Sequence, residues 1–303
     1  MKINKYFPGF TPKAITFSID DGNLKYDKVF IDIVRPAGIT GTFNLCLGKT
    51  RSITDEQYRE FYCGFDIANH CTRHPFAFNP DKEYVFTEKP FLRESADTSL
   101  VYKSDREGLY YVYHRSYWGT LATTEAYLEL AEEGRRNIEE IFGKGSVRGF
   151  VWPYGKQKDE KLFEALKNSG YASIRKAYSE GFSIPTDKMD WGVNADSSSF
   201  EAKILEFDAM ADDGELKYFC FGLHSVDFER AEKWDALREF AKTYGNRPDD
   251  FWYAPVGDIF EYDEAMNSIK VTENAVYNPS DKELYISIND SKYILPPKSE
   301  TKI

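Results

Sequence analysis

The sequence predicts an α/β protein built as a single (β/α) barrel. Runs rich in β-branched and aromatic residues alternate with runs that have helical spacing of apolar residues, giving six or seven β-α units. The 303 residues leave room for one barrel, which typically takes about 250 residues. Two adjacent carboxylates, Asp20 and Asp21, directly follow the first predicted strand, at the strand end where barrel enzymes place their active sites.

The first part of the chain repeats strand and helix in order. Strands are predicted at 15–19, 38–45 and 64–69, and helices at 27–35 and 53–61. Residues 75–120 interrupt this alternation with prolines and a dense aromatic cluster from Tyr110 to Trp118. We expect an insertion beside the loop of the third strand, serving as a lid or as one wall of the substrate cleft.

The alternation resumes with a long amphipathic helix at 124–142, which Gly143 ends. Further strands are predicted at 148–153, 171–174, 191–194 and 217–223, and further helices at 160–169, 201–208 and 229–244. Short alternating runs after residue 262 predict a small antiparallel β extension. The predicted division is therefore a barrel at 1–262, containing the insertion at 75–120, and an extension at 263–303.

Composition excludes several kinds of partner. A net charge of −11 argues against nucleic acid and anionic membrane surfaces, which require clusters of Lys and Arg. No segment reaches the roughly 18 uninterrupted apolar residues of a membrane helix, so we expect no membrane insertion. The four cysteines lack a Cys-x-x-Cys pair, which fits reduced thiols, and no apolar stretch of signal-peptide length opens the chain. We expect a cytoplasmic protein; its oligomeric state is not indicated.

Histidines are the second chemical signal. His70 and His74 lie four residues apart and would share one side of a helical turn. Together with a carboxylate they form a typical ligand set for a hydrolytic metal that keeps a position open for water and substrate. His224 follows another predicted strand. The alternatives are an ordinary Asp-Gly turn after the first strand and a chance histidine spacing.

Taken in chain order, four motifs resemble those of the polysaccharide deacetylases of carbohydrate esterase family 4, the NodB-homology group. They are Phe17-Ser-Ile-Asp-Asp-Gly22, His70-Cys-Thr-Arg-His-Pro75, Trp152-Pro-Tyr-Gly155 and Leu223-His224. The resemblance implies an irregular seven-stranded (β/α) barrel. It also implies a metal-dependent hydrolase that removes N- or O-linked acetyl groups from a sugar or oligosaccharide.

The resemblance also implies roles for particular residues. Asp20 would be the general base, His224 the general acid, and the backbone N–H of Tyr154 an oxyanion donor. The ligands of a divalent metal, expected to be zinc with cobalt or another ion as alternatives, would be Asp21, His70 and His74. Substrate contacts are expected from Trp152, Pro153 and Trp191.

Three positions depart from the family pattern. Cys71 stands where Ser or Thr is usual, Val151 stands where Arg is usual, and the fourth motif is recognisable only loosely at 190–196. We predict that Arg175, at the end of the next strand, replaces the missing arginine and orients Asp20, since a guanidinium binds a carboxylate in a fixed geometry.

Two other functions compete with deacetylation. One is a metal-independent hydrolase of a cyclic amide or ureide on the same fold, and the other is a non-catalytic carbohydrate-binding protein. The joint presence of Asp21, His70 and His74 argues against the first. The sequence leaves open which sugar is the substrate and whether the acetyl linkage is an amide or an ester.

Overall fold

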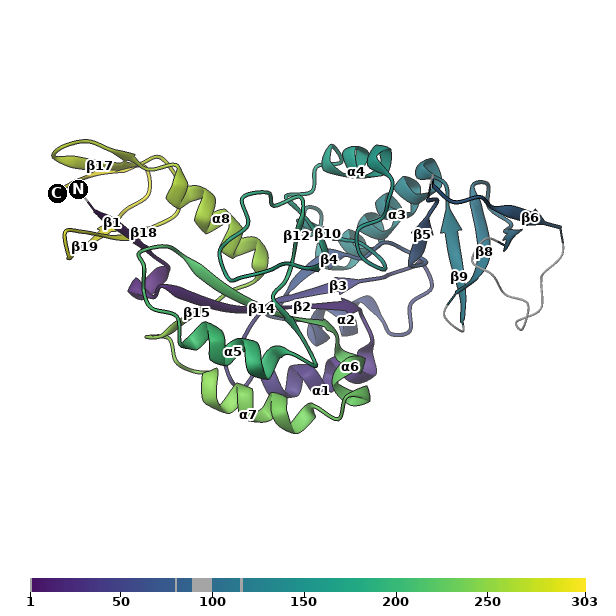
Figure 1. The fold of residues 1–303 in the computed structure, drawn as a ribbon, viewed down its shortest axis with the longest axis horizontal. Coiled ribbons are helices and arrows are strands. Elements are labelled where there is room, and N and C mark those ends of the chain that lie inside the picture. The colour runs from purple at the N-terminus through teal and green to yellow at the C-terminus, as the bar shows by residue number, and fades with distance from the viewer. Residues whose placement is uncertain (1, 80, 89–99, 115–116) are drawn as a thin grey trace.

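A nearly closed barrel of parallel strands forms the centre of the molecule (Figure 1). The computed structural model describes residues 2–79, 81–88, 100–114 and 117–303. In order around the barrel, the strands are β2 (Lys13–Asp21), β3 (Thr42–Leu45), β4 (Asp66–Asn69), β10 (Gly149–Val151), β11 (Ser173–Tyr178), β12 (Trp191–Val193), β13 (Ala195–Asp196) and β14 (Lys217–His224).

Strand β14 pairs with β2 along its whole length, which places the last strand of the barrel beside the first. Strands β12 and β13 follow each other directly in the chain; β12 pairs with β11, and β13 pairs with β14. Counted as one bent strand, they bring the barrel to seven strands. The predicted irregular seven-stranded (β/α) barrel is therefore confirmed.

Helices cover the outside of the barrel. They are α1 (Leu24–Val34), α2 (Asp55–Phe61), α3 (Thr124–Phe142), α4 (Glu160–Lys167), α5 (Phe200–Asp208), α6 (Ser225–Arg230), α7 (Trp234–Tyr244) and α8 (Val256–Asn267). The alternation along β2 explains this layering: Phe17 points outward and packs against Phe30 of α1 with ring centroids 4.9 Å apart. Its neighbour Ser18 points into the barrel, on the same side as Asp20.

Two features of the second half differ from the prediction. The single helix predicted at 229–244 is wrong, because α6 and α7 are separated at Ala231–Lys233, where Glu232 takes a left-handed φ of 56°. Strand β15 (Phe251–Tyr253) and helix α8 were not predicted. Strand β15 pairs with the first residues of β2, and β3 pairs with the last residues of β2. Both strands therefore lie along the same edge of β2, one after the other.

The insertion is a five-stranded sheet that projects from one end of the molecule (Figure 1). Its strand order is β5 (Pro75–Ala77), β9 (Tyr117–Ala122), β8 (Leu109–His114), β7 (Leu100–Lys103) and β6 (Val85–Thr87). The sheet starts just after the loop that follows β4 and leads into α3, so it stands at the end of the barrel where β4 finishes. Buried Val101, Val112 and Leu121 give it a small core of its own.

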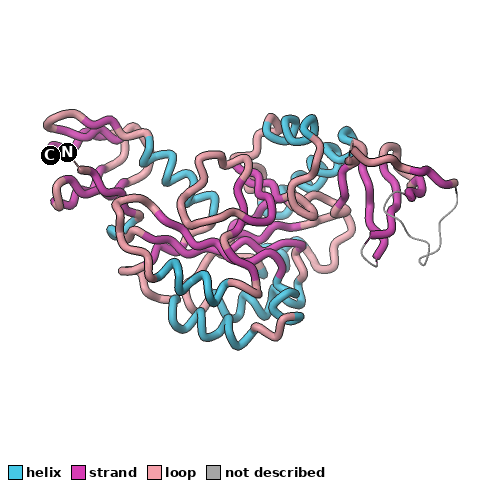
Figure 2. The backbone as a smooth tube through the Cα atoms, in the orientation of Figure 1, coloured by secondary structure: helices cyan, strands magenta, loops and turns pink. Residues whose placement is uncertain are grey.

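The two chain ends meet at the opposite end of the molecule, where Figure 2 shows their strands together. One sheet contains β1 (Ile3–Tyr6), β18 (Leu284–Ile288) and β19 (Ser291–Leu295), and the other β16 (Lys270–Val271), β17 (Ala275–Asn278) and β20 (Ser299–Lys302). The C-terminal strands are antiparallel, as expected, but the pairing of β1 with β18 was not predicted. Leu284 and Ile286 share one apolar cluster with Tyr218 of the barrel.

Among the described residues, no helix has the length and apolar character needed to cross a membrane.

A candidate metal centre at the barrel mouth

The end of β2 brings the predicted acidic pair into the barrel mouth. In the sheet register, Asp20 lies beside Asn44 of β3 on one side and beside His224 of β14 on the other. Asp21 adopts a left-handed φ of 77°, which turns the chain out of the strand. Parallel pairing therefore gathers an acid, an amide and an imidazole in one row at the carboxyl ends of the strands.

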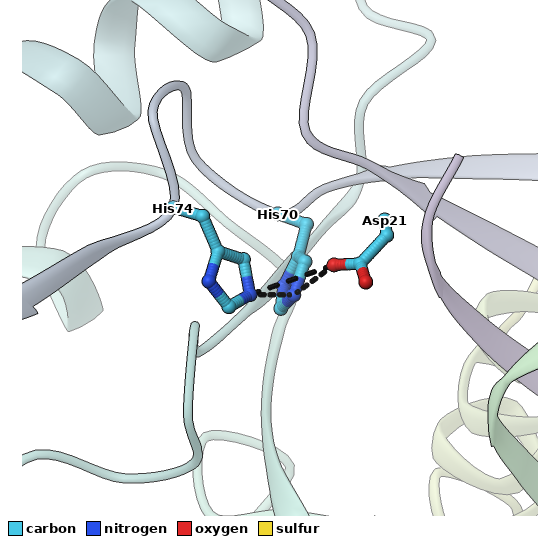
Figure 3. A group of neighbouring side chains, drawn as sticks. All are labelled: Asp21, His70 and His74. Atoms are coloured by element: carbon cyan, nitrogen blue, oxygen red, sulfur yellow. Dashed lines mark hydrogen bonds and ion pairs between the residues drawn. The ribbon is translucent and has the colours of Figure 1, made fainter. Parts of the chain in front are cut away.

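Three potential metal ligands converge next to this row (Figure 3). Asp21 Oδ1 lies 3.5 Å from Nε2 of His70 and 3.5 Å from Nε2 of His74, and the two Nε2 atoms are 3.0 Å apart. Tetrahedral ligands at zinc bond lengths are about 3.3 Å from each other. Within the described part of the chain, these three residues form the only such group found. The donor set and its spacing fit a divalent ion.

The two histidines are prepared for this use. His70 is buried, and its Nδ1–H donates to the carbonyl oxygen of Val151 at 3.0 Å, which leaves the Nε2 lone pair facing the other ligands. Burial, together with the neighbouring His70, lowers the pKa of His74 to about 4. The imidazole of His74 is therefore available in the neutral form that binds a metal.

The loop that carries these histidines is not the helical turn that their spacing predicted. Left-handed φ values occur at Cys71 (61°), Arg73 (60°) and His74 (45°), and this tight reversal points both Nε2 atoms the same way. Asn69 fixes the start of the loop, because its Oδ1 accepts the N–H of Cys71 at 3.0 Å and its Nδ2 donates to the carbonyl of Ala131 at 2.6 Å.

Hydrogen-bond donors from two other strands hold the carboxylate of Asp20. The Nη2 group of Arg175 donates to both of its carboxylate oxygens, and Asn44 Nδ2 donates to Oδ1 at 2.7 Å. Arg175 reaches Asp20 across the barrel interior, and in the register it lies beside Val151. The structure thus provides the predicted contact between Arg175 and Asp20. Sequence reasoning missed Asn44, whose position opposite Asp20 depends on strand pairing.

His224 completes the mouth on the side of β14. Its Nδ1 lies 2.8 Å from Asp227 Oδ2, and its Nε2 lies 3.9 Å from Asp21 Oδ2. Burial alone would lower the pKa of His224, but the hydrogen bond to Asp227 and the charges of Asp20 and Asp21 raise it to about 9. Sequence reasoning also missed Asp227, although an acid three residues after a histidine is close enough to orient it.

Of the aromatic residues expected at the site, Tyr154 lies beside a potential metal ligand, whereas Trp152 and Trp191 do not reach the surface. Tyr154 stacks on Phe76 with ring centroids 3.6 Å apart, and its ring lies edge-on to His74 at 4.4 Å. Trp152 and Trp191 are 2% and 3% exposed and pack in the core, against Tyr127 and Phe260 respectively. Pro153 is also buried. The substrate contacts expected of Trp152, Pro153 and Trp191 therefore do not fit this structure, because motif position alone does not say which side of a strand is exposed.

A buried carboxyl group lies behind the mouth and was not predicted. Asp27 of α1 accepts hydrogen bonds from Tyr62 Oη at 2.8 Å and from Ser225 Oγ at 2.6 Å. Burial raises its pKa to about 7, even though both hydroxyl groups stabilise the charged form. Because Ser225 directly follows His224, Asp27 ties α1 to the residue next to the imidazole.

The chain is similar to known proteins in sequence and in fold. A sequence model described as polysaccharide deacetylase matches residues 9–174. Among curated proteins there is no match. Three solved structures are similar at low identity, as follows.

The Xyl-CE4 domain of a multidomain xylanase from the hindgut metagenome of Trinervitermes trinervoides is 17% identical, with a TM-score of 0.46 over 84% of this chain and 91% of that chain. Peptidoglycan deacetylase PdaC from Bacillus subtilis is 13% identical, with a TM-score of 0.43 over 88% and 94%. A family 4 acetyl xylan esterase from Clostridium thermocellum is 14% identical, with a TM-score of 0.45 over 82% and 90%.

Proposed function

The chain belongs to the polysaccharide deacetylase family, hydrolases that act on acetylated carbohydrate, and we propose that it works with one divalent metal ion. The ligands would be Asp21, His70 and His74, and the expected ion is zinc. The supporting observation is their geometry: three ligand atoms lie 3.0–3.5 Å apart beside a second carboxylate, Asp20, that other donors hold. Such a set suits metal-assisted hydrolysis better than metal-free amide hydrolysis or simple binding.

We assign the proton transfers to the side chains on either side of the ligands. A divalent ion at this site would supply Lewis acidity to the attacking water and to the acetyl carbonyl. Asp20 takes a proton from the water as the water oxygen bonds to the carbonyl carbon. The backbone N–H of Tyr154 is assigned to the oxyanion that develops.

His224 then serves the leaving group. As the bond between the carbonyl carbon and the sugar nitrogen or oxygen breaks, Nε2–H of His224 protonates the departing amine or alcohol. Acetic acid is left, which loses its proton to solvent as acetate, and the proton held by Asp20 returns to His224 through water. Asp227 accepts the Nδ1–H of the same ring and keeps Nε2 directed at the mouth. Arg175 and Asn44 act only through Asp20, whose carboxylate they keep turned toward the attacking water.

The test separates ligands from the base. His70→Ala with His74→Ala should lower bound metal and acetate release together, whereas Asp20→Asn should abolish turnover with metal still bound. Metal content is measured by elemental analysis. Acetate release is measured on acetylated monosaccharides, chitooligosaccharides, peptidoglycan fragments and acetylated xylan, with zinc added back. Asp32→Asn, an exposed carboxylate on α1, is the control.

Full occupancy of one tightly bound ion in the double histidine variant would refute the assigned ligands. Near wild-type turnover in Asp20→Asn would refute the assigned base.

A further inference from the structure

One side of the insertion sheet carries a surface of neighbouring aromatic rings. Residues paired in register point to the same side of a sheet. The pairs Phe76 with Leu121 and Tyr110 with Leu121 therefore place Phe76 and Tyr110 together. The pairs Val101 with Val112 and Phe86 with Val101 add Phe86 to the same side. We refer to this side as the aromatic face; it carries Phe76, Tyr110 and Phe86, together with Phe78 and Tyr84 from the connection between β5 and β6.

Four rings of the aromatic face contact one another, from Phe78 directly after β5 to Phe86 in the outermost strand. Phe78 lies 4.7 Å from Tyr84 and 5.5 Å from Tyr110, measured between ring centroids, and Tyr110 lies 5.1 Å from Phe86. The sheet is about 19 Å wide from β5 to β6, since it has four strand spacings of about 4.8 Å. That width exceeds what a single sugar residue covers.

The aromatic face begins at the proposed active site. Phe76 stacks on Tyr154, whose ring packs on the metal ligand His74. Gly119 of β9 makes room for this arrangement, because a Cβ atom there would lie 3.0 Å from the Phe76 ring. The inner end of the face is therefore continuous with the barrel mouth.

Two hollows flank the aromatic face. The inner one, about 300 Å³, is lined by Phe76, Tyr154 and polar side chains, namely Asn79, Gln157, Lys156 and Lys158. The outer one, about 600 Å³, is lined by Phe86 and Tyr110 together with Thr87, Ser104, Glu88 and Lys103. Both combine aromatic walls with hydrogen-bonding groups, and the outer one balances one acid with one base.

Phe86 is more exposed than the sheet's own core explains. Val101 and Val112 are already buried beneath Phe78, Tyr84 and Tyr110, yet Phe86 remains 57% exposed. An exposed large apolar side chain, continuous with a functional mouth, indicates a surface that contacts a ligand.

We propose that the aromatic face binds the carbohydrate chain on one side of the acetylated sugar, and so extends the substrate site from the barrel mouth onto the insertion. This inference rests on the proposed function. A sugar ring presents apolar C–H faces and a polar edge of hydroxyl groups. These match aromatic walls bordered by amides, hydroxyls, lysines and one carboxylate.

Sedimentation of the full-length protein with insoluble chitin, peptidoglycan sacculi and acetylated xylan tests the proposal. Wild type should bind at least one polymer, and Phe86→Ala should weaken that binding about fivefold or more, as loss of an aromatic contact does. Phe86→Tyr should restore it. Tyr111→Ala is the matched control, because Tyr111 is an exposed aromatic residue of β8 on the opposite side of the sheet from Tyr110. His70→Ala should keep polymer binding while losing turnover.

Kinetics gives a second measurement. Phe86→Ala should raise KM for the bound polymer severalfold more than it raises KM for an acetylated monosaccharide, which is too short to span from the mouth to Phe86.

The proposal is overturned if wild type binds none of the polymers, or if Phe86→Ala binds them as wild type does. It is also overturned if Phe86→Ala instead changes the mass in sedimentation equilibrium, because the aromatic face would then contact another protein chain. Polymer binding that depends on Phe86, without acetate release from any substrate, would refute the proposed function and leave the binding surface intact.

Discussion

At the scale of single residues, the orientation of Asp20 depends on side chains that lie far from it in the sequence. Asn44 reaches it from β3, and Arg175 reaches it across the barrel. Val151 occupies the neighbouring position on β10, where the family usually has arginine, and both residues point into the barrel. A guanidinium on β11 can therefore take the place of one on β10.

Arg175→Lys should lower kcat about tenfold to a hundredfold with metal content unchanged, because lysine keeps the charge but loses the planar fork that fixes the carboxylate. The exchange variant Val151→Arg with Arg175→Val should recover part of the lost rate, since it restores a guanidinium at the same level of the barrel. Steady-state kinetics and elemental analysis on the same samples check both effects. Wild-type kcat in Arg175→Lys would contradict a positioning role.

The buried carboxyl group of Asp27 predicts a pH-dependent stability. Its pKa is raised from 3.8 to about 7 in the folded state, so the folded protein holds a proton that the unfolded chain releases between these values. The resulting stabilisation is fully present below pH 3.8 and is lost as the pH rises through about 7. Its size is about 4 kcal/mol.

Asparagine at position 27 stays neutral at every pH. The free energy of unfolding of Asp27→Asn should therefore rise relative to that of wild type as the pH increases from 4 to 8. Guanidinium unfolding at several pH values, on metal-free protein, measures the difference. A difference between the two proteins that does not change with pH would contradict the expectation.

Sequence alone identified the residues whose type and spacing are themselves unusual, namely the adjacent acids Asp20 and Asp21 and the histidine pair. It missed Asn44, Asp227 and Asp27, because an asparagine or aspartate becomes informative only through its neighbours in space. The contact of Arg175 with Asp20 could be predicted, because the carboxylate needs a guanidinium to orient it and Arg175 ends a neighbouring predicted strand.

At the scale of elements, the periodicity of apolar residues predicted most barrel strands and the helices around them. It could not predict the shape of the loop after β4, because left-handed backbone at Cys71 and His74 depends on contacts with α3. Asn69 bonds to the carbonyl of Ala131, and Gly134 of the same helix faces Asn69. The two histidines proposed as metal ligands are therefore positioned by a helix that follows the insertion in the chain.

Gly134→Ala tests this dependence. In an ordinary helix the change stabilises by up to about 1 kcal/mol. Here the new Cβ would lie 2.5 Å from Asn69 Oδ1 and 3.2 Å from the Cys71 carbonyl carbon, so we expect a loss of about 1–3 kcal/mol. Metal affinity should fall as well, because His70 directly follows Asn69.

Chemical unfolding and zinc titration measure both effects of Gly134→Ala. Glu132→Ala, on the exposed side of the same helix, is the control. A gain in stability in Gly134→Ala would show that the loop does not need the close approach.

At the scale of the whole molecule, strands from the two chain ends pack together against the barrel, at the end of the molecule opposite the insertion. The extension predicted at 263–303 is joined to the barrel by one apolar cluster, in which Leu284 and Ile286 pack with α8 and with Tyr218 of β14. Tyr262 Oη of α8 also donates to the carbonyl of Tyr6 at 2.7 Å. The sequence could not predict this pairing of β1 with β18, because the two strands lie at opposite ends of the chain and no residue pattern in either strand identifies its partner.

The shared cluster predicts that the extension and the barrel unfold together. Ile286→Ala removes a fully buried side chain and should lower the free energy of unfolding by about 2–5 kcal/mol. Ile294→Ala, in the adjacent strand β19 at 45% exposure, is the matched control and should change the free energy of unfolding little.

Native-state hydrogen exchange locates the effect. In Ile286→Ala, protection should fall by the same free energy for amides of β18 and for amides of β2 and β14. Loss of protection confined to the C-terminal strands, with β2 and β14 unchanged, would mean that the extension is an independent unit. Equal losses would instead make the C-terminal strands part of the structure that holds the barrel closed, and with it the row of Asp20 and His224 at the mouth.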